Sequence, residues 1–168
     1  MNTPSSLTVE TPSDREVRVT RKFKAPARLV WDAHTKPELL RKWMYGFEGW
    51  SLPICEMDVR VGGAYRWHWR NDTDGQEMGF FGKYIEVTPP TRLVYDQHYD
   101  PGSLGIPMTT EPTIITMVFT ESGGFTTLTV TMLYASREER DAAVATGMTE
   151  GMELSYQRMD ALLSGHQS

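Results

Sequence analysis

The chain has 168 residues, of which 39% are hydrophobic, and a formal net charge of −5, which fits one domain with a sizeable core. The acidic balance without any run of Lys or Arg argues against nucleic acid as a partner, and the lack of an apolar stretch of about 18 residues or of a charged and then apolar N-terminus argues against a membrane span and a secretory signal. We therefore expect a cytoplasmic protein, whose single cysteine, Cys55, forms no internal disulfide and belongs to no zinc site.

The two ends of the chain are predicted to lie outside the fold. Residues 1–14 are rich in Ser and Pro and poor in apolar residues, a composition that predicts a disordered N-terminal tail. We expect residues 15–164 to form a single domain and residues 165–168 to form a short C-terminal tail.

The domain is predicted to begin with a strand and two short helices. Residues 16–24 alternate between apolar and polar side chains, as a half-buried strand does. The apolar members are Val17, Val19 and Phe23. Pro26 favours the start of a short helix over residues 26–34, and a second short helix begins after Thr35, with Pro37 in its first turn.

From residue 51 onward the apolar residues recur with period two, which predicts hairpin-connected strands separated by Gly, Pro and Asp turns. The predicted strands are residues 51–59, 64–71, 77–87, 92–99, 113–120 and 125–134. In the second of these, Tyr65, Trp67 and Trp69 share one face, which we expect to point inward. His68 lies on the opposite face, where we expect solvent.

The last stretch, residues 136–163, is predicted to be one continuous helix of about seven turns. Its face residues alternate at steps of four and three: Met148, Met152, Ser155, Met159 and Leu162. Ser136 followed by Glu139 is a capping-box start, and Gly165 is the predicted stop.

These elements predict an α+β fold in which a curved antiparallel sheet wraps around the long C-terminal helix. Methionine dominates the predicted helix face, and methionine tolerates an irregular or partly empty interior better than branched side chains do. The pattern therefore indicates an internal cavity, with an ordinary methionine-containing core as the alternative.

Several short motifs resemble the Aha-type family, whose namesake is a domain of a heat-shock chaperone ATPase activator and which belongs to the START-like, Bet v 1-like superfamily. The resemblance extends over residues 15–163. Its motifs are Trp31, Thr35-Lys36-Pro37-Glu38, Trp43, Arg60-Val61-Gly62-Gly63-Ala64-Tyr65-Arg66, Asp74-Gly75, Gly82-Lys83-Tyr84-Ile85-Glu86-Val87-Thr88-Pro89-Pro90-Thr91-Arg92-Leu93-Val94, and the pair Gly147 and Gly151. The resemblance implies the helix-grip (START-like) fold, with two short helices after the first strand.

The chain departs from the family pattern at two positions. Met44 and Met152 stand where the family usually has an aromatic residue. Because a thioether occupies less volume than an indole, Met152 either lets the sheet close in or leaves room for a guest molecule.

A non-catalytic binder of a hydrophobic or aromatic small molecule is the leading functional hypothesis, because an apolar pocket with a few polar groups is the usual form of a ligand site. Tyr95, Tyr134 and Ser155 are the candidates for orienting hydrogen bonds. The predicted ligand-binding residues are Tyr65, Trp67, Trp69, Tyr95, Met132, Tyr134, Met148, Met152, Ser155 and Met159. The alternative is that these side chains only fill the core.

A sharper version of this hypothesis concerns residues 100–108, a segment that is long and apolar for a hairpin loop and is typical either of a pocket cover or of a flexible edge excursion. Some members of the superfamily bind an enediyne antibiotic and are cleaved by the diradical that it forms. Such self-sacrifice requires a glycine beside the cavity, and Gly102 and Gly105 are the predicted cleavage sites.

Two other functional classes stay open. The first is a co-chaperone-like interaction module with a chaperone as partner, which the family implies but the single short domain disfavours. The second is an enzyme similar to polyketide cyclases, for which Asp96 and His98, two apart on one strand, are the only acid–base pair worth testing. We assign no catalytic residue, and the sequence carries no motif for a phosphate, a cofactor or a metal.

Overall fold

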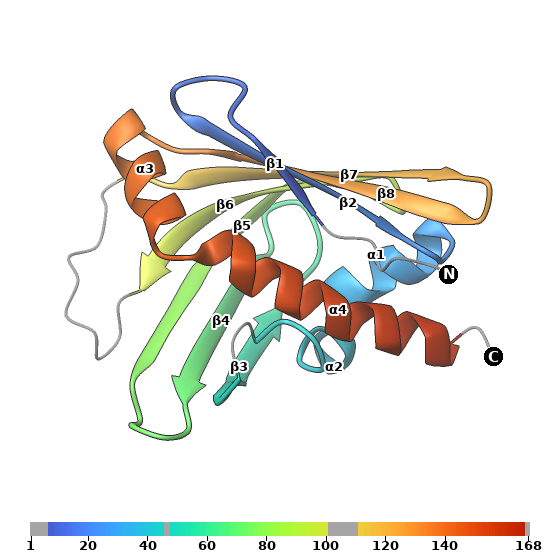
Figure 1. Cartoon of the computed structure of the whole chain (residues 1–168), viewed down its shortest axis with the longest axis horizontal. Coiled ribbons are helices and arrows are strands. Elements are labelled where there is room, and N and C mark those ends of the chain that lie inside the picture. The colour runs from blue at the N-terminus through green and yellow to red at the C-terminus, as the bar shows by residue number, and fades with distance from the viewer. Residues whose placement is uncertain (1–6, 46–47, 101–110, 167–168) are drawn as a thin grey trace.

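The computed structural model describes residues 7–45, 48–100 and 111–166. These residues form an eight-stranded antiparallel sheet in the order β1-β2-β8-β7-β6-β5-β4-β3. The strands are β1 (Thr8–Glu10), β2 (Glu16–Phe23), β3 (Trp50–Met57), β4 (Ala64–Asn71), β5 (Glu77–Thr88), β6 (Arg92–Asp100), β7 (Thr113–Ser122) and β8 (Phe125–Leu133). The sheet curves around the helix α4 (Met148–His166), so the predicted helix-grip architecture is confirmed (Figure 1).

Short turns join β3 to β4, β4 to β5, β5 to β6 and β7 to β8, and each of these pairs is antiparallel, as the sequence predicts. The strands β7 and β8 are joined by Gly123 and Gly124, with φ of 60° and 83°, and this left-handed backbone matches the twist of a two-residue hairpin. In the pairing of β2 with β8, Val19 lies opposite Val130. The period-two pattern therefore places one apolar face of each strand against the core.

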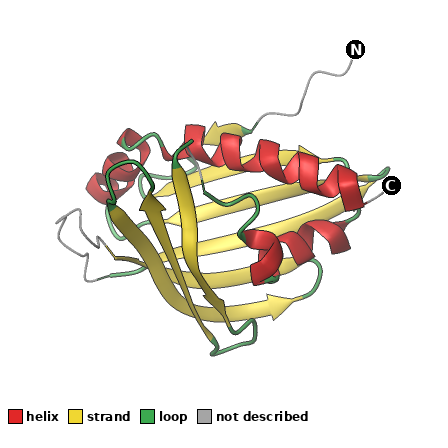
Figure 2. Cartoon of the chain, turned by 90° about the horizontal axis from the view of Figure 1, so that it is seen from below, coloured by secondary structure: helices red, strands yellow, loops and turns green. Residues whose placement is uncertain are grey.

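Two short helices follow β2 and lie beside the C-terminal part of α4 (Figure 2). They are α1 (Ala27–Thr35) and α2 (Pro37–Leu40), and the extended residue Lys36 separates them. The buried Trp43, which follows α2, donates from Nε1 to the carbonyl oxygen of Ala33 at 2.9 Å. This hydrogen bond ties the end of α2 back to α1.

The prediction of one continuous C-terminal helix is wrong. The structure has two helices, α3 (Arg137–Ala145) and α4, and Gly147 between them adopts a φ of 81°. A left-handed residue interrupts helical hydrogen bonding, and glycine adopts it without steric cost. The predicted start is confirmed, because Ser136 Oγ accepts from the backbone N–H of Glu139 at 3.1 Å.

The prediction that Gly165 ends the helix is also wrong, since α4 continues to His166. A glycine in a helix weakens it but does not terminate it. None of the helices in the described residues combines the length and apolar character that a bilayer crossing needs.

Part of the predicted N-terminal tail belongs to the sheet. The strand β1 pairs with β2, with Val9 opposite Val19, and the backbone N–H of Leu7 donates to Glu153 Oε1 on α4 at 3.0 Å. The prediction failed here because an edge strand is held by backbone hydrogen bonds, which do not require an apolar composition.

The core face of α4 is shifted from its predicted position. Ser155, Tyr156 and Met159 are buried, with Met159 fully enclosed. Farther along the helix Leu163 is buried, whereas the predicted Leu162 is only half-buried. Since the α-helix has 3.6 residues per turn, a strict step of four and three drifts from the core within a few turns.

Candidate functional site

Four aromatic side chains on the concave face of the sheet contact one another, and we call them the aromatic cluster. They are Tyr65, Trp67, Tyr84 and Tyr95. The rings of Tyr65 and Trp67 lie 4.4 Å apart, and those of Tyr65 and Tyr95 lie 5.2 Å apart, edge to face. All four side chains are buried.

The strand register explains why these residues meet. In the pairing of β5 with β6, Tyr84 lies opposite Tyr95. In the pairing of β4 with β5, Tyr65 lies opposite Gly82, which has no side chain to occupy the space over the sheet. Residues two apart on one strand share a face, so Trp67 follows Tyr65 on the same side.

The polar atoms of the aromatic cluster are unequally satisfied. The hydroxyl of Tyr65 donates to the carbonyl oxygen of Asp96 at 2.7 Å. By contrast, the indole Nε1 of Trp67 and the hydroxyl of Tyr84 are buried and have no hydrogen-bond partner among the described residues. Buried polar atoms are nearly always paired, so two atoms in one cluster without a partner among the described residues make this cluster the candidate site.

Burial keeps these hydroxyls protonated. Desolvation raises the pKa of Tyr65, Tyr84 and Tyr95 well above the ordinary value of 10.0. The cluster therefore offers neutral hydrogen-bond donors in an apolar setting, which suits recognition of acceptor groups rather than proton abstraction.

The predicted site residue Trp69 extends the wall formed by the aromatic cluster. Its ring lies 6.4 Å from that of Trp67, and its Nε1 donates to the carbonyl oxygen of Met44 at 2.7 Å. Beyond it, Phe80 packs 5.6 Å from Trp69 and 5.7 Å from Tyr99. These outer aromatic side chains are half-buried, so the wall becomes more exposed toward this end.

Three other predicted residues make a separate contact between β8 and α4. The hydroxyl of Tyr134 lies 3.5 Å from the sulfur of Met148 and 3.8 Å from that of Met132. Burial raises the pKa of Tyr134 to about 12. The structure thus places these side chains against one another.

The remaining predicted residues lie on α4 or outside the described part of the chain. Ser155 and Met159 are buried under α4, and Met152 is half-buried and packed against the core. The predicted cleavage residues Gly102 and Gly105 lie outside the described residues.

Two aromatic residues of this region, Tyr84 and Tyr156, are not among the site residues predicted from the sequence. The ring of Tyr156 on α4 stacks on Trp43 at 5.9 Å and meets Phe23 edge to face at 5.4 Å. Tyr84 lies within a predicted strand and in a motif quoted for the family resemblance. The sequence therefore carried a signal that could have placed Tyr84 in the aromatic cluster. Tyr156 was missed because the predicted helix face passes through its neighbour Ser155 and then through Met159, and so leaves out position 156.

Beside the aromatic residues, a buried ion cluster joins α4 to the sheet. Arg21, whose side chain is fully enclosed, donates to both carboxylate oxygens of Glu153 at 2.9 and 3.1 Å and to both of Asp160 at 2.9 Å. Its guanidinium also lies 4.9 Å from the ring centre of Phe23 and 5.7 Å from that of Tyr156. This cluster fixes the helix relative to the face on which the predicted site lies.

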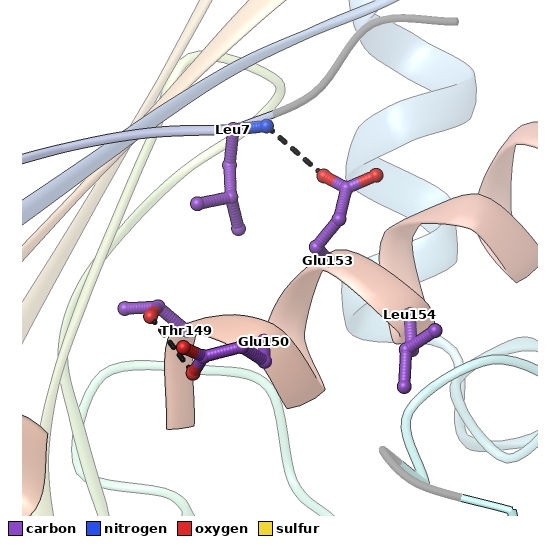
Figure 3. Close-up of a pocket in the computed structure, with 5 residues that line it drawn as sticks. All are labelled: Leu7, Thr149, Glu150, Glu153 and Leu154. Atoms are coloured by element: carbon purple, nitrogen blue, oxygen red, sulfur yellow. Dashed lines mark hydrogen bonds between the residues drawn. The ribbon is translucent and has the colours of Figure 1, made fainter. Parts of the chain in front are cut away.

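A surface groove of about 360 Å³ lies between the start of β1 and the first turns of α4 (Figure 3). Its lining residues are Leu7, Thr149, Glu150, Glu153 and Leu154. None of the predicted ligand-binding residues lines it. We therefore place the candidate site at the aromatic cluster, where the unpaired donors are, and not at this groove.

The acid–base pair considered from the sequence does not form a hydrogen bond. Asp96 Oδ1 lies 4.0 Å from His98 Nε2, and it accepts from the backbone N–H of Lys83 at 2.8 Å. The imidazole of His98 instead stacks on Phe81, with ring centres 5.1 Å apart. A base and its orienting carboxylate need hydrogen-bond contact, which this geometry does not provide.

The expectation that His68 faces solvent is wrong. Its side chain is buried on the outer face of the sheet between two carboxylates, 3.2 Å from Glu77 and 3.7 Å from Asp100. The neighbouring Gly79 leaves space that the imidazole fills, since a Cβ there would meet the ring at 2.7 Å. Within the described residues, no three His, Cys, Asp or Glu side chains are arranged to hold a metal ion.

A family model described as "Activator of Hsp90 ATPase homolog 1-like protein" matches residues 24–164. The chain belongs to this family. The match begins directly after β2 and ends in the last turn of α4, so it covers the strands β3 to β8 and the helices α1 to α4. A search of curated proteins finds no match.

Solved structures share the fold of this chain. A protein from Rhodobacter sphaeroides is 28% identical, with a TM-score of 0.83 over 95% of this chain and 99% of that chain. A protein from Chromobacterium violaceum is 27% identical, with a TM-score of 0.76 over 90% and 98%. An AHSA1-like protein from Aeromonas hydrophila is 18% identical, with a TM-score of 0.67 over 86% and 93%, and this likeness concerns the fold alone.

Proposed function

We propose that this member of the family binds an aromatic or otherwise apolar small molecule between α4 and the aromatic cluster, without catalysing a reaction on it. One observation carries the proposal. The indole N–H of Trp67 and the hydroxyl of Tyr84 are buried on one concave face without partners in the described residues. A ligand with oxygen or nitrogen acceptors would satisfy both groups.

Binding of a ligand with acceptor groups would remove the energetic cost of the two unsatisfied donors. Leaving a buried donor unsatisfied costs about 1–3 kcal/mol, and two such donors in a cluster cost more than most single contacts contribute. A ligand that accepts from both recovers this free energy on binding, while the rings of the cluster supply apolar contact area. Ordered water is the competing occupant, because it satisfies the same donors.

The outer end of the wall offers a route for a ligand to enter. Trp69, Phe80 and Tyr99 are half-buried there, and so are Met44 and Met152. Methionine side chains change rotamer easily, so they can open and close around a guest. The two positions at which the sequence departs from the family pattern, Met44 and Met152, are thus both half-buried.

Binding is tested with 6-propionyl-2-(dimethylamino)naphthalene, a neutral aromatic ketone whose carbonyl oxygen can accept two hydrogen bonds and whose fluorescence changes in apolar sites, and with native mass spectrometry for stoichiometry. We expect one probe molecule per chain. Trp67→Phe and Tyr84→Phe should each weaken binding about tenfold, the effect of one lost hydrogen bond. Trp50→Phe, the same substitution on a half-buried tryptophan of β3, is the matched control and should leave affinity unchanged.

Two outcomes of the probe titrations would contradict the ligand-binding proposal. If no probe binds, or if it binds equally well to Trp67→Phe and to the unsubstituted chain, the unpaired donors are hydrated and the aromatic cluster is only core.

A finer version of the proposal is antibiotic self-resistance through self-sacrifice, with an enediyne as the ligand and cleavage at Gly102 or Gly105. Glycine suits this chemistry because its Cα–H bonds are not shielded by a side chain. Incubation with an activated enediyne should yield two fragments by denatured intact mass, and substitution of the cleaved glycine by alanine should reduce fragmentation. An uncleaved chain that still binds the drug would leave the binding proposal standing and remove the self-sacrifice version.

The description of the family supports a second candidate, activation of a chaperone ATPase. It is tested by adding the chain to an Hsp90-class ATPase and measuring ATP turnover. Stimulation that survives Trp67→Phe would favour a protein-docking surface over an internal ligand site.

A further inference from the structure

A second unpaired donor group lies on α4, at the guanidinium of Arg158. Its Nη1 is buried and has no hydrogen-bond partner among the described residues. The guanidinium carbon lies 3.7 Å from the ring centre of Tyr45, so the group is held flat against an aromatic ring. A cation in this position is pre-organised, and its recorded ion pair, with the exposed Glu48 at 3.8 Å, is loose.

Among the described residues, no buried acidic side chain is paired with Arg158. The positions three and four residues away on the helix are Leu154, Ser155, Ala161 and Leu162, none of which is acidic. Glu48 is the nearest carboxylate with a recorded contact, at 3.8 Å, and its side chain is 96% exposed, so solvent screens this pair. The acids of α4 that face the sheet, Glu153 and Asp160, are both bonded to Arg21.

Arg158 is connected to the aromatic wall through a short series of contacts. It lies over Tyr45, which follows Met44 in the chain, and the carbonyl oxygen of Met44 accepts from the indole of Trp69. The ring of Trp69 in turn meets that of Trp67. The cation therefore lies beside the half-buried end of the wall, where the proposed entrance is.

We infer that Arg158 binds an anionic group, carboxylate or sulfonate, on the ligand. This inference rests on the proposed function, and it adds that the ligand is an aromatic or aliphatic acid with its apolar body on the wall and its charge at α4. The planar fork of a guanidinium donates two parallel hydrogen bonds to such a group. On binding, the ligand anion replaces the loosely paired carboxylate of Glu48.

The test uses two fluorescent probes that differ by one sulfonate. They are 8-anilinonaphthalene-1-sulfonate and the neutral N-phenyl-1-naphthylamine. We expect the unsubstituted chain to bind the sulfonate probe about tenfold more tightly, which corresponds to one charge-assisted contact. Arg158→Met should remove this preference while leaving the affinity for the neutral probe unchanged, and Arg158→Lys should restore part of it.

Arg137→Met is the matched control, because its side chain is 65% exposed on α3 and the substitution removes the same charge from the protein. It should leave both affinities unchanged. Near-ultraviolet circular dichroism of each variant confirms that the sulfonate probe reports a native site and not an unfolded chain.

The outcomes separate the two proposals. Equal affinity of the unsubstituted chain for both probes, or a preference that survives Arg158→Met, overturns the anion site while the ligand-binding proposal stands. Failure of both probes to bind overturns the ligand-binding proposal, and the anion site with it. If Arg158→Met does not fold, the comparison between the two probes on the unsubstituted chain and on Arg158→Lys decides the matter.

Discussion

Arg21 on β2 and Asp160 on α4 form a two-pronged ion pair, with Nη1 to Oδ1 and Nη2 to Oδ2 both at 2.9 Å. Glu153, about two helical turns before Asp160 on α4, accepts hydrogen bonds from Nε and Nη2 of the same guanidinium. The side chain of Arg21 is fully enclosed, whereas Asp160 is 38% exposed. The buried guanidinium therefore has only its carboxylate partners to compensate its lost hydration, whereas Asp160 keeps part of its contact with solvent.

Arg21→Met should lower the free energy of unfolding by about 3 kcal/mol, since removal of one partner from a buried pair costs about 3–5 kcal/mol and the remaining carboxylates here regain some solvent contact. Urea unfolding followed by circular dichroism measures this. Arg92→Met is the control, because it breaks an exposed pair with Glu86 at 3.1 Å and should cost less than about 1 kcal/mol. Equal losses in the two variants would contradict the structural role of the buried cluster.

Acid should destabilise the protein through His34. Burial lowers the pKa of this imidazole from 6.5 to about 4, so the unfolded chain binds the proton more readily, and stability falls as the pH drops from 6.5 towards 4. The full effect is on the order of 3 kcal/mol. Unfolding free energies at a series of pH values measure it.

The variant His34→Phe should flatten this pH dependence, since phenylalanine keeps the ring contacts with Trp43 and Phe119 and carries no titrating group. Compared with that of His34, the titration of Glu153 affects stability in a lower pH range. Its hydrogen bonds with Arg21 hold its pKa below the ordinary 4.5, against the effect of burial, so its contribution is lost only at lower pH. An unchanged slope between pH 6.5 and 4.5 in His34→Phe would refute the assignment.

Two tyrosine variants of the aromatic cluster should change stability in opposite directions. Tyr84→Phe removes a buried unpaired hydroxyl and should stabilise the ligand-free protein by about 1 kcal/mol. Tyr65→Phe removes the hydroxyl bonded to Asp96 and should destabilise it by a similar amount. Thermal unfolding of the two variants side by side is the measurement, and a loss of stability in Tyr84→Phe would mean that its hydroxyl is already satisfied.

Gly147→Ala should destabilise the protein by about 1–2 kcal/mol, because its φ of 81° is a left-handed conformation that a Cβ disfavours. Gly165→Ala is the matched control. Gly165 lies within the helix α4 with open space around its Cα, so alanine there should be neutral or slightly stabilising. Chemical unfolding of both variants distinguishes the two backbone environments.

Most of the fold was predictable because its signals are local. Strand periodicity and glycine turns placed the strand over residues 64–71 at the bounds of β4. The helix break at Gly147 was missed because an amphipathic pattern does not record the sign of φ. The strand β1 was missed because its attachment is made by the backbone of Thr8–Glu10 and not by its composition.

The candidate site was only partly predictable, because its decisive feature is a pair of buried donors, Trp67 Nε1 and the Tyr84 hydroxyl, that find no acceptor in the described part of the chain. Alternation assigned Tyr65 and Trp67 to one inward face, and Tyr95 was predicted separately as a candidate for an orienting hydrogen bond. The structure brings the three rings together. Which donors lack acceptors depends on atoms from several strands, which no local pattern records. Arg21 had a local signal, since it alternates in phase with Val19 and Phe23, but its partner Glu153 is 132 positions away.

The two outermost strands of the sheet, β1 and β3, determine how readily another chain can pair with it. An exposed edge presents unpaired N–H and C=O groups on which another chain can add as a strand, and this is a route to aggregation. One edge is the three-residue strand β1. The other is β3, which contains Pro53 and has a register shift between Ser51 and Ile54. Short strands, proline and bulges all disfavour strand addition, so both borders of this open sheet resist growth into fibrils.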